Sequence, residues 1–131
     1  ITNRHLLIDV VDRLKEADVR VSIFSETDLH MIEGAMLTGT DRIELYTEPY
    51  AAQYAENRDA AIADFIRAAE AAKELGLGLN AGHDLSLENL AFFHQQIPWL
   101  EEVSIGHALV CDALYMGLER TVQAYLDCLK R

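Results

Sequence analysis

The stretch GLNAGH (residues 78–83) decides the fold of this 131-residue chain. Its first five residues predict a short strand, which ends at a glycine followed by a histidine. A long helical pattern capped by Asn57 precedes the strand, and a shorter one capped by Ser86 follows it. A strand between two helices is the repeating unit of an α/β fold, so we expect the rest of the chain to repeat it.

The same unit recurs on both sides of this stretch. Alternating strands and helices predict a parallel sheet with helices packed outside it. No linker or low-complexity tract interrupts the chain, so residues 1–131 are expected to form a single unit. The other predicted strands are short runs rich in β-branched residues: VRVSIF (19–24), RIELYT (42–47) and EVSIG (102–106).

Capping and turn residues set the expected helix boundaries. The first helix should be capped by Thr2 or Asn3. A second should be capped by Thr27 or Asp28 and closed by Gly39. The remaining expectations are a loop at EPYAAQYAEN (48–57), a break at Pro98, and two closing helices, HALVCDALYMG and LERTVQAYLDCLKR.

Composition excludes several classes of function. The net charge of −11 argues against nucleic acid and anionic membranes as partners, because both need a basic surface. No apolar run reaches the roughly 18 residues of a membrane span, and no signal peptide is recognisable. Cys111 and Cys128 are expected to be reduced core residues, which favours a cytoplasmic setting. The chain opens without Met, which indicates a fragment.

The strands RIELYT and EVSIGH favour a barrel, although an isolated four-stranded parallel sheet is also possible. Arg42, Glu44 and Tyr46 share one face of this strand, while Ile43 and Leu45 share the other. Polar groups that face inward near strand ends are typical of a (β/α)₈ TIM barrel, whose active site lies at the carboxyl ends of its strands. Such a barrel needs about 250 residues, so this chain would supply about half of one.

Two glycine–histidine pairs stand where strands end. Gly82-His83 closes one predicted strand and Gly106-His107 closes the next, at the edge where α/β folds bind ligands. His83 is the better candidate for proton transfer, because it lies in a loop. His107 opens a helix, whose first backbone N–H groups suit a phosphate. For each pair, the purely steric need for a small residue in a turn stays open as the alternative.

Glu44 is the third candidate, since a carboxylate within a strand is costly unless it is paired. It could form a salt bridge with Arg42 or with a neighbouring strand, or it could face the site and stabilise developing charge. Glu44, His83 and His107 could also form a metal site, but no ligand-spacing motif supports one and no metal is expected. No Lys or Arg lies directly after a predicted strand, so backbone amides would have to bind any phosphate here.

Four segments in this order resemble the pyridoxine 5′-phosphate synthase family of vitamin B6 biosynthesis. The resemblance covers nearly the whole chain, and NAGH and IGHA are its most specific parts. It implies a (β/α)₈ barrel in which this chain supplies the last four β/α units, with the N-terminal half missing. The four segments are VSIF, IELYTEPYA, GLGLNAGHDL and EVSIGHALVCDALYMGLERTV.

The resemblance also implies an activity. The family condenses 1-deoxy-D-xylulose 5-phosphate with 3-amino-2-oxopropyl phosphate, giving pyridoxine 5′-phosphate, inorganic phosphate and water. It needs no cofactor, is cytoplasmic and forms a homo-octamer. Its other catalytic residues lie on the first four strands, so this segment alone is expected to be inactive.

Site residues follow from the resemblance position by position. His83 matches the proton donor, and Glu44 matches a carboxylate that stabilises the transition state. Gly106 and His107 match the pair that binds the phosphate of the amino-ketone substrate. Asp84 stands where a glycine of the family also binds that substrate.

Further departures from the family pattern leave two alternatives open. Tyr46 and Glu48 stand where the family tends to have His and Gly, and residues 25–28 also differ. With Asp84, these changes put substrate affinity in question and would suit a diverged, non-catalytic binding protein. Another phosphate-binding barrel enzyme, such as an isomerase or lyase, is the second alternative.

Overall fold

The computed structural model describes residues 3–130 of the chain. Its helices and strands alternate, as the sequence predicts. In chain order they are α1 (Arg4–Glu16), β1 (Ser22–Ser25), α2 (Leu29–Met36), β2 (Arg42–Tyr46), α3 (Glu48–Glu74), β3 (Gly78–Gly82), α4 (Leu90–Gln96), β4 (Glu102–Ser104), α5 (His107–Met116) and α6 (Leu118–Cys128).

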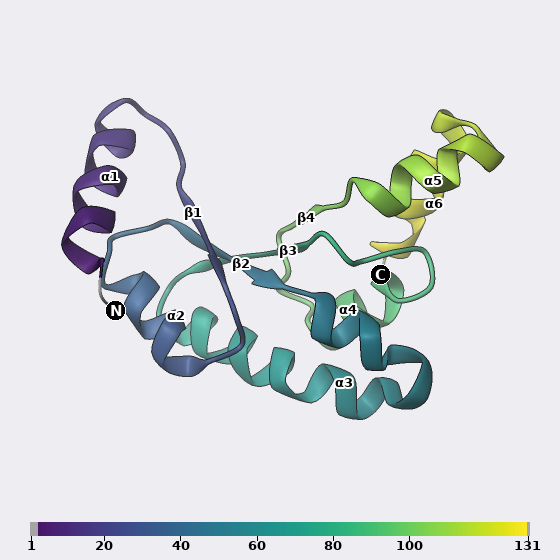
Figure 1. Cartoon of the computed structure of the whole chain (residues 1–131), viewed down its shortest axis with the longest axis horizontal. Helices are drawn as coiled ribbons and strands as arrows, with labels where there is room; N and C mark the ends of the chain where they lie inside the picture. The colour runs from purple at the N-terminus through teal and green to yellow at the C-terminus, as the bar shows by residue number, and fades with distance from the viewer. Residues whose placement is uncertain (1–2, 131) are drawn as a thin grey trace.

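The four strands form one parallel sheet in the order β1-β2-β3-β4, so each strand lies beside its neighbours in the sequence. Helices α2, α3 and α4 pack along one side of this sheet, while α1 lies at one end and α5 with α6 at the other (Figure 1). A fold class of α/β with a parallel sheet is therefore confirmed. The sheet is open, with β1 and β4 as its edges, and the closed barrel stays a prediction.

The two faces of the sheet differ as the pattern of RIELYT predicts. Ile43 and Leu45 are fully buried on the helix-covered face, and Leu79 and Ala81 of β3 lie beside them. The opposite face carries Arg42, Glu44 and Tyr46, each partly buried, and the exposed Phe24 of β1. This second face is polar and aromatic, which suits the inside of a barrel mouth better than a hydrophobic core.

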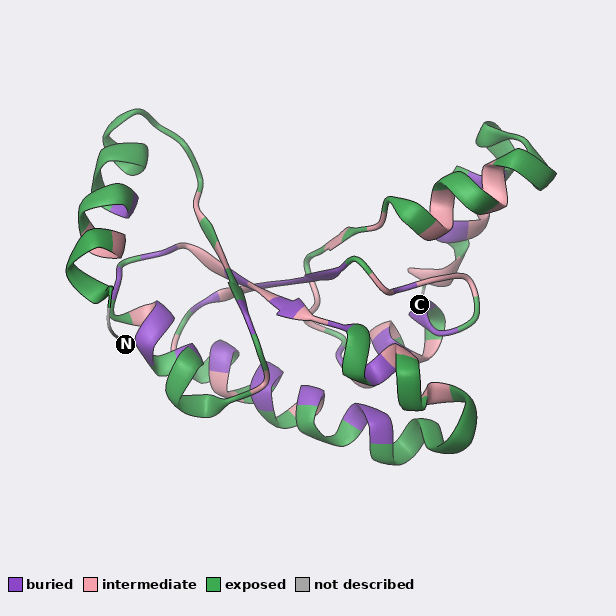
Figure 2. Cartoon of the chain, viewed as in Figure 1, coloured by how far each residue is buried: buried purple, intermediate pink, exposed green. Residues whose placement is uncertain are grey.

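An aromatic cluster joins α3 to α4. Tyr50 is fully buried, and its ring makes edge contacts with Phe65 of α3 and Phe93 of α4. Its hydroxyl donates a hydrogen bond of 2.7 Å to the backbone oxygen of Asn89. Figure 2 shows the buried residues gathered on the sides of α2, α3 and α4 that face the sheet, which is where the core lies.

One predicted loop is wrong: residues 48–57 are helical and form the first part of α3. Pro49 lies in the first turn, where its missing N–H costs nothing, and the alanines that follow favour a helix. Asn57 interrupts the helix with φ −156° and ψ 89°. Its side-chain oxygen accepts a hydrogen bond of 3.0 Å from the N–H of Ala60, so Asn57 caps the second part as predicted.

Other predicted boundaries shift by a few residues. The first strand begins at Ser22 rather than at residue 19, because Val19 lies outside the sheet and is half exposed. Asp28 caps α2 through the N–H groups of His30 and Met31, as expected. Ser86 caps a turn instead of α4, which begins at Leu90.

Three further outcomes concern the ends of the chain and the cysteines. Asn3 precedes α1 without a side-chain cap, and the alternative cap Thr2 lies outside the described residues. Cys111 and Cys128 are both free thiols, but Cys111 is exposed, so its placement in the core is wrong. Within residues 3–130, the helices are too short or too polar to cross a membrane.

Candidate functional site

The carboxyl edge of the sheet carries the site residues predicted from the sequence. Glu44 lies in β2, Gly82-His83 closes β3, and Gly106-His107 follows β4 at the start of α5. Parallel strands end at one edge of a sheet, and the register places Gly82 beside Ser104 of β4. The two glycine–histidine corners therefore lie on neighbouring strands.

Gly82 lets two residues, Glu44 and Ser104, approach closely. A Cβ atom at this position would lie 2.4 Å from the backbone oxygen of Ser104 and 3.0 Å from a carboxylate oxygen of Glu44. The next residue, His83, donates its backbone N–H to the same Ser104 oxygen over 2.8 Å. The glycine thus has a steric role, and this role is what brings Glu44 and the backbone of β4 against the end of β3.

Glu44 does not pair with Arg42, which was one of its expected partners. The Arg42 guanidinium contacts Glu101 at 2.7 Å and the side-chain oxygen of Asn80 at 3.1 Å. Glu44 instead accepts a long hydrogen bond of 3.5 Å from the hydroxyl of Ser104. The carboxylate is only partly buried, so it stays available to a ligand at this edge.

His83 occupies a strained turn. Its φ of 67° lies in the left-handed region, where residues other than glycine are uncommon. The N–H of Asp84 donates to the backbone oxygen of Gly82 over 2.9 Å, which closes a γ-turn of the rarer type around His83. Strain of this kind gathers at functional sites, because surrounding contacts must hold it in place.

The side chains of His83 and Asp84 contact each other. The Nδ1 atom of His83 lies 3.1 Å from a carboxylate oxygen of Asp84. The imidazole is 74% exposed and the carboxylate 25% exposed, so the ring projects from the edge while the acid lies beneath it. Asp84 therefore adds a negative charge beside the ring.

Gly106 and His107 start α5, a helix of ten residues. The first helical hydrogen bond runs from the N–H of Val110 to the oxygen of Gly106, and no described side chain caps the helix start. The N–H groups of the first turn thus have no acceptor within the helix, as a phosphate site requires. The His107 ring is exposed and its Nε2 atom lies 3.7 Å from the sulfur of Cys111.

Two residues at this edge escaped the sequence-based prediction. Thr47 directly follows β2 and is fully buried, and its hydroxyl donates a hydrogen bond to the oxygen of Gly82. Ser104 ends β4 and contacts both Glu44 and the N–H of His83. In both cases the sequence feature that could have identified the residue is a hydroxyl side chain at the carboxyl end of a predicted strand.

The structure brings Glu44, Gly82, His83 and Ser104 into contact, whereas His107 lies three residues beyond Ser104 and has its contact with Cys111. Among the described residues, no three His, Cys, Asp or Glu side chains are placed to hold a metal ion together.

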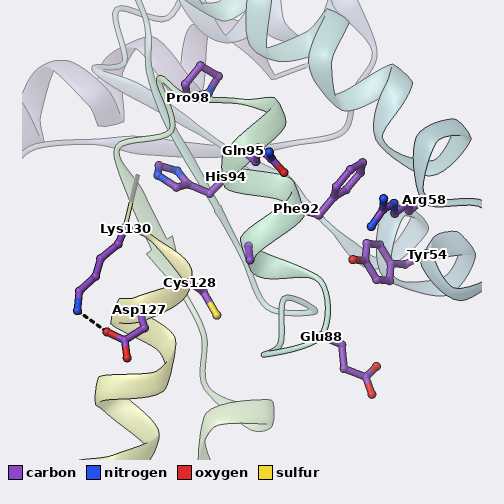
Figure 3. A pocket seen from close by; sticks show the side chains of 11 residues that line it. Tyr54, Arg58, Glu88, Phe92, His94, Gln95, Pro98, Asp127, Cys128 and Lys130 are labelled. Atoms are coloured by element: carbon purple, nitrogen blue, oxygen red, sulfur yellow. Dashed lines mark hydrogen bonds and ion pairs between the residues drawn. The ribbon is translucent and has the colours of Figure 1, made fainter.

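A cavity of about 600 Å³ lies elsewhere, between α3, α4 and α6 (Figure 3). The guanidinium of Arg58 lies 4.6 Å from the centre of the Phe92 ring on one side, and Lys130 pairs with Asp127 on the other. None of the predicted site residues lines it. This cavity is therefore separate from the residues at the carboxyl edge.

Comparison with known proteins gives the family. Residues 1–131 match the profile of the pyridoxal phosphate biosynthesis protein PdxJ. The chain is 64% identical over 127 residues to the pyridoxine 5′-phosphate synthase of Parabacteroides distasonis, an alignment that covers 97% of this chain and 53% of that protein. For the enzyme of the same name from Bacteroides thetaiotaomicron, identity is 56% over 128 residues, covering 98% and 54%.

The synthase of Cytophaga hutchinsonii is 55% identical over all 131 residues and is covered to 55% of its length. The chain thus spans about half the length of the curated relatives it matches. Because the family profile covers every residue, the chain belongs to the pyridoxal phosphate biosynthesis protein PdxJ family.

Proposed function

We propose that this chain is the C-terminal half of a (β/α)₈ barrel and that the completed barrel is a pyridoxine 5′-phosphate synthase. The observation that carries the proposal is 64% identity to such a synthase across 97% of the chain. The predicted proton donor, the predicted acid and the predicted phosphate-binding pair all lie at the edge where barrel enzymes have their active sites.

Two features of the fold support a half barrel. The sheet face that carries Arg42, Glu44 and Tyr46 lies opposite the helix-packed face, as the lining of a barrel would. The sheet also ends in two strand edges, and large apolar side chains are exposed at both ends of the molecule, including Phe24 and Leu114. Exposed edges and apolar patches of this kind are normally covered, and four further β/α units would cover them.

The site residues have separate roles in the proposed reaction. His83 transfers a proton, and the Glu44 carboxylate stabilises the positive charge that develops during ring closure. The N–H groups after Gly106, together with His107, bind the phosphate of 3-amino-2-oxopropyl phosphate, while Asp84 borders that site. The second phosphorylated substrate, 1-deoxy-D-xylulose 5-phosphate, and any cationic clamp would be held by the other half.

We further propose that the completed protein acts in the cytoplasm without a cofactor and forms a homo-oligomer, an octamer by the family resemblance. Neither nucleic acid nor membrane is a partner under this proposal, in keeping with the net charge of −11.

Reconstitution tests the proposal. The chain is produced alone and also fused behind the part of the Parabacteroides distasonis synthase that its alignment leaves unmatched. Both proteins receive the two substrates, and inorganic phosphate and pyridoxine 5′-phosphate are measured. We expect turnover by the fusion and none by the chain alone, because half of the catalytic groups are then absent.

Variants of the fused protein test whether His83 takes part in the reaction. His83→Gln should lower kcat by about 100-fold or more, the usual effect of losing a general acid. His30→Gln is the matched control, since the His30 side chain is 93% exposed and pairs with Glu33 of its own helix. Turnover by the isolated chain would refute the proposal. A fusion that binds phosphate without turnover would instead favour the diverged, non-catalytic alternative.

A further inference from the structure

The backbone around His83 is held from one side by a single buried hydroxyl. Thr47 is fully buried and lies directly beyond the end of β2. Its hydroxyl donates to the oxygen of Gly82 and accepts from the N–H of Asp84 over 3.2 Å. These are the two residues that flank His83, so one side chain ties both ends of the strained turn.

The ring of His83 is held by a second contact. The backbone of Asp84 is fixed by Thr47 and Gly82, so its carboxylate starts from a defined position and lies 3.1 Å from Nδ1 of the ring. A carboxylate accepts hydrogen bonds and does not donate them, so this contact requires the proton to be on Nδ1. The opposite nitrogen, Nε2, is then the one that faces a substrate.

We propose that Thr47 and Asp84 are positioning residues for His83: the hydroxyl fixes the turn that presents the histidine, and the carboxylate fixes its ring and its tautomer. The catalytic consequence rests on the proposed function, in which His83 transfers a proton through Nε2. The structural consequence does not, because it concerns only the state of the ring and the turn in this chain.

The tautomer tests the role of Asp84 without any assay of activity. In the ¹⁵N-labelled chain, the ring nitrogens of His83 are observed by NMR and assigned with His83→Gln. We expect Nδ1 to carry the proton when the ring is neutral, and Asp84→Ala to shift the population toward protonated Nε2. Glu88→Ala is the matched control, because it removes an exposed carboxylate from the same loop. An unchanged tautomer in Asp84→Ala would overturn this part of the proposal.

Two variants of nearly equal size test Thr47. Thr47→Val removes the hydroxyl and keeps the shape, while Thr47→Ser keeps the hydroxyl. We expect the amide of Asp84 to exchange with solvent at least about 5-fold faster in Thr47→Val, since it loses one of its two hydrogen-bond acceptors and the turn that holds the other, the Gly82 oxygen, is no longer tied to Thr47. In Thr47→Ser the exchange rate should return close to that of the parent chain. Equal rates in all three proteins would contradict the role of Thr47.

Kinetics of the fused protein separate positioning from binding. Thr47→Val should lower kcat by about 10-fold and change KM by less than about 2-fold, because misplacing a reacting group affects the chemical step. Thr47→Ser should recover most of the loss. A KM effect without a kcat effect would overturn the positioning role. If the fusion is inactive, the proposed function fails, while the NMR and exchange results still decide this inference.

Discussion

The centre of the sheet and its two ends differ in how completely their apolar side chains are buried. In the centre, β2 and β3 pack against α3 and α4, and Ile43, Leu45 and Leu79 are at most 1% exposed. At the ends, α1 with β1 and α5 with α6 leave large apolar side chains in solvent. Leu114 is 80% exposed and Tyr115 is 92% exposed, and α5 has no buried residue.

This difference indicates which parts of the chain are complete by themselves. The centre has a finished core on its helix-covered face, with close-packed aliphatic and aromatic groups. At the ends many apolar side chains are exposed although Val11 and Tyr125 are buried, and the outer strands β1 and β4 each have an unpaired edge. Since soluble proteins seldom leave large apolar patches open, the ends are where we expect the proposed N-terminal half to pack.

The largest effect should come from Leu79→Ala in the centre. We expect a loss of about 3 kcal/mol in the free energy of unfolding, because the change leaves a cavity in a core that cannot collapse. Leu114→Ala at the end makes the same chemical change at an exposed position and should stay within about 0.5 kcal/mol. Urea unfolding of both variants measures the contrast.

The same two variants can also be compared in the fused protein. There, Leu114→Ala should become costly, by about 1–2 kcal/mol, if the added half covers α5. A cost near zero in the fusion would contradict the idea that this end is a packing surface. Equal costs for Leu79→Ala and Leu114→Ala in the chain alone would contradict the distinction between centre and ends.

Gly82→Ala should have the next largest effect, about 2 kcal/mol, because its Cβ would lie 2.4 Å from the Ser104 oxygen. Either β4 moves away or the hydrogen bond from the His83 N–H is lost. Gly106→Ala is the control, since a Cβ there meets nothing within 4 Å. Thermal unfolding measures the melting temperatures of the two variants. Equal melting temperatures would show that the close contact at Gly82 does not limit stability.

Much of the centre could be predicted from the sequence. The alternation of Ile43 and Leu45 with polar neighbours gave the two faces of β2, and the strand Gly78–Gly82 was placed without error. The periodicity of apolar residues predicts which side chains are buried, and the buried side chains hold the centre of the sheet together. The meeting of Gly82 and Ser104 at one edge followed as well, because the carboxyl ends of parallel strands lie at the same edge of a sheet, whereas the site itself stays a prediction.

The remaining features depend on contacts that no local pattern carries. Residues 48–57 read as a loop, but the helix there is held by Tyr50, whose ring packs among aromatics from distant segments. The hydroxyl of Thr47 forms hydrogen bonds with Gly82 and Asp84, which lie 35 and 37 positions further along the chain. Cys111 was expected in the core because reduced cysteines are usually buried, but α5 has no buried residue and Cys111 is exposed.

Tyr50→Phe should cost about 1–2 kcal/mol at pH 7, since the backbone oxygen of Asn89 loses its buried donor. It should also change the response to alkali. Burial raises the pKa of Tyr50 above its usual value near 10, so the folded state keeps a proton that the unfolded chain releases. The contribution of this tyrosine is present in full below pH 10 and is lost as the pH rises further.

Urea unfolding of the parent chain and of Tyr50→Phe between pH 9 and 11 measures this response. The variant should lose less stability over that range. Its slope should not vanish, because the pKa of Tyr125 is also raised, by burial and by its hydrogen bond to Asp112. Identical slopes would show that the Tyr50 hydroxyl titrates as freely in the folded protein as in the unfolded chain.

The smallest effect should come from Asp41→Asn, where the centre meets one of the ends. The Asp41 carboxylate accepts the backbone N–H of Val21 over 2.9 Å and pairs with Lys15 of α1, so it ties α1 and β1 to the start of β2. Its pKa is lowered, first by the Val21 N–H and then by Lys15. The stabilisation is therefore present above about pH 4 and is lost as the pH falls below it.

We expect Asp41→Asn to cost only about 0.5 kcal/mol at pH 7, because both partners are exposed enough for solvent to screen the pair. Its effect should be local: hydrogen exchange should quicken in β1, while the amides of β3 keep the protection of the parent chain. Asp64→Asn on α3 is the control, since Asp64 pairs only with the exposed Arg67 on its own helix. Equal increases in exchange in β1 and β3 would contradict this prediction. They would show that the end and the centre unfold as one unit, because the loss of a contact within the end alone should not speed exchange in the centre.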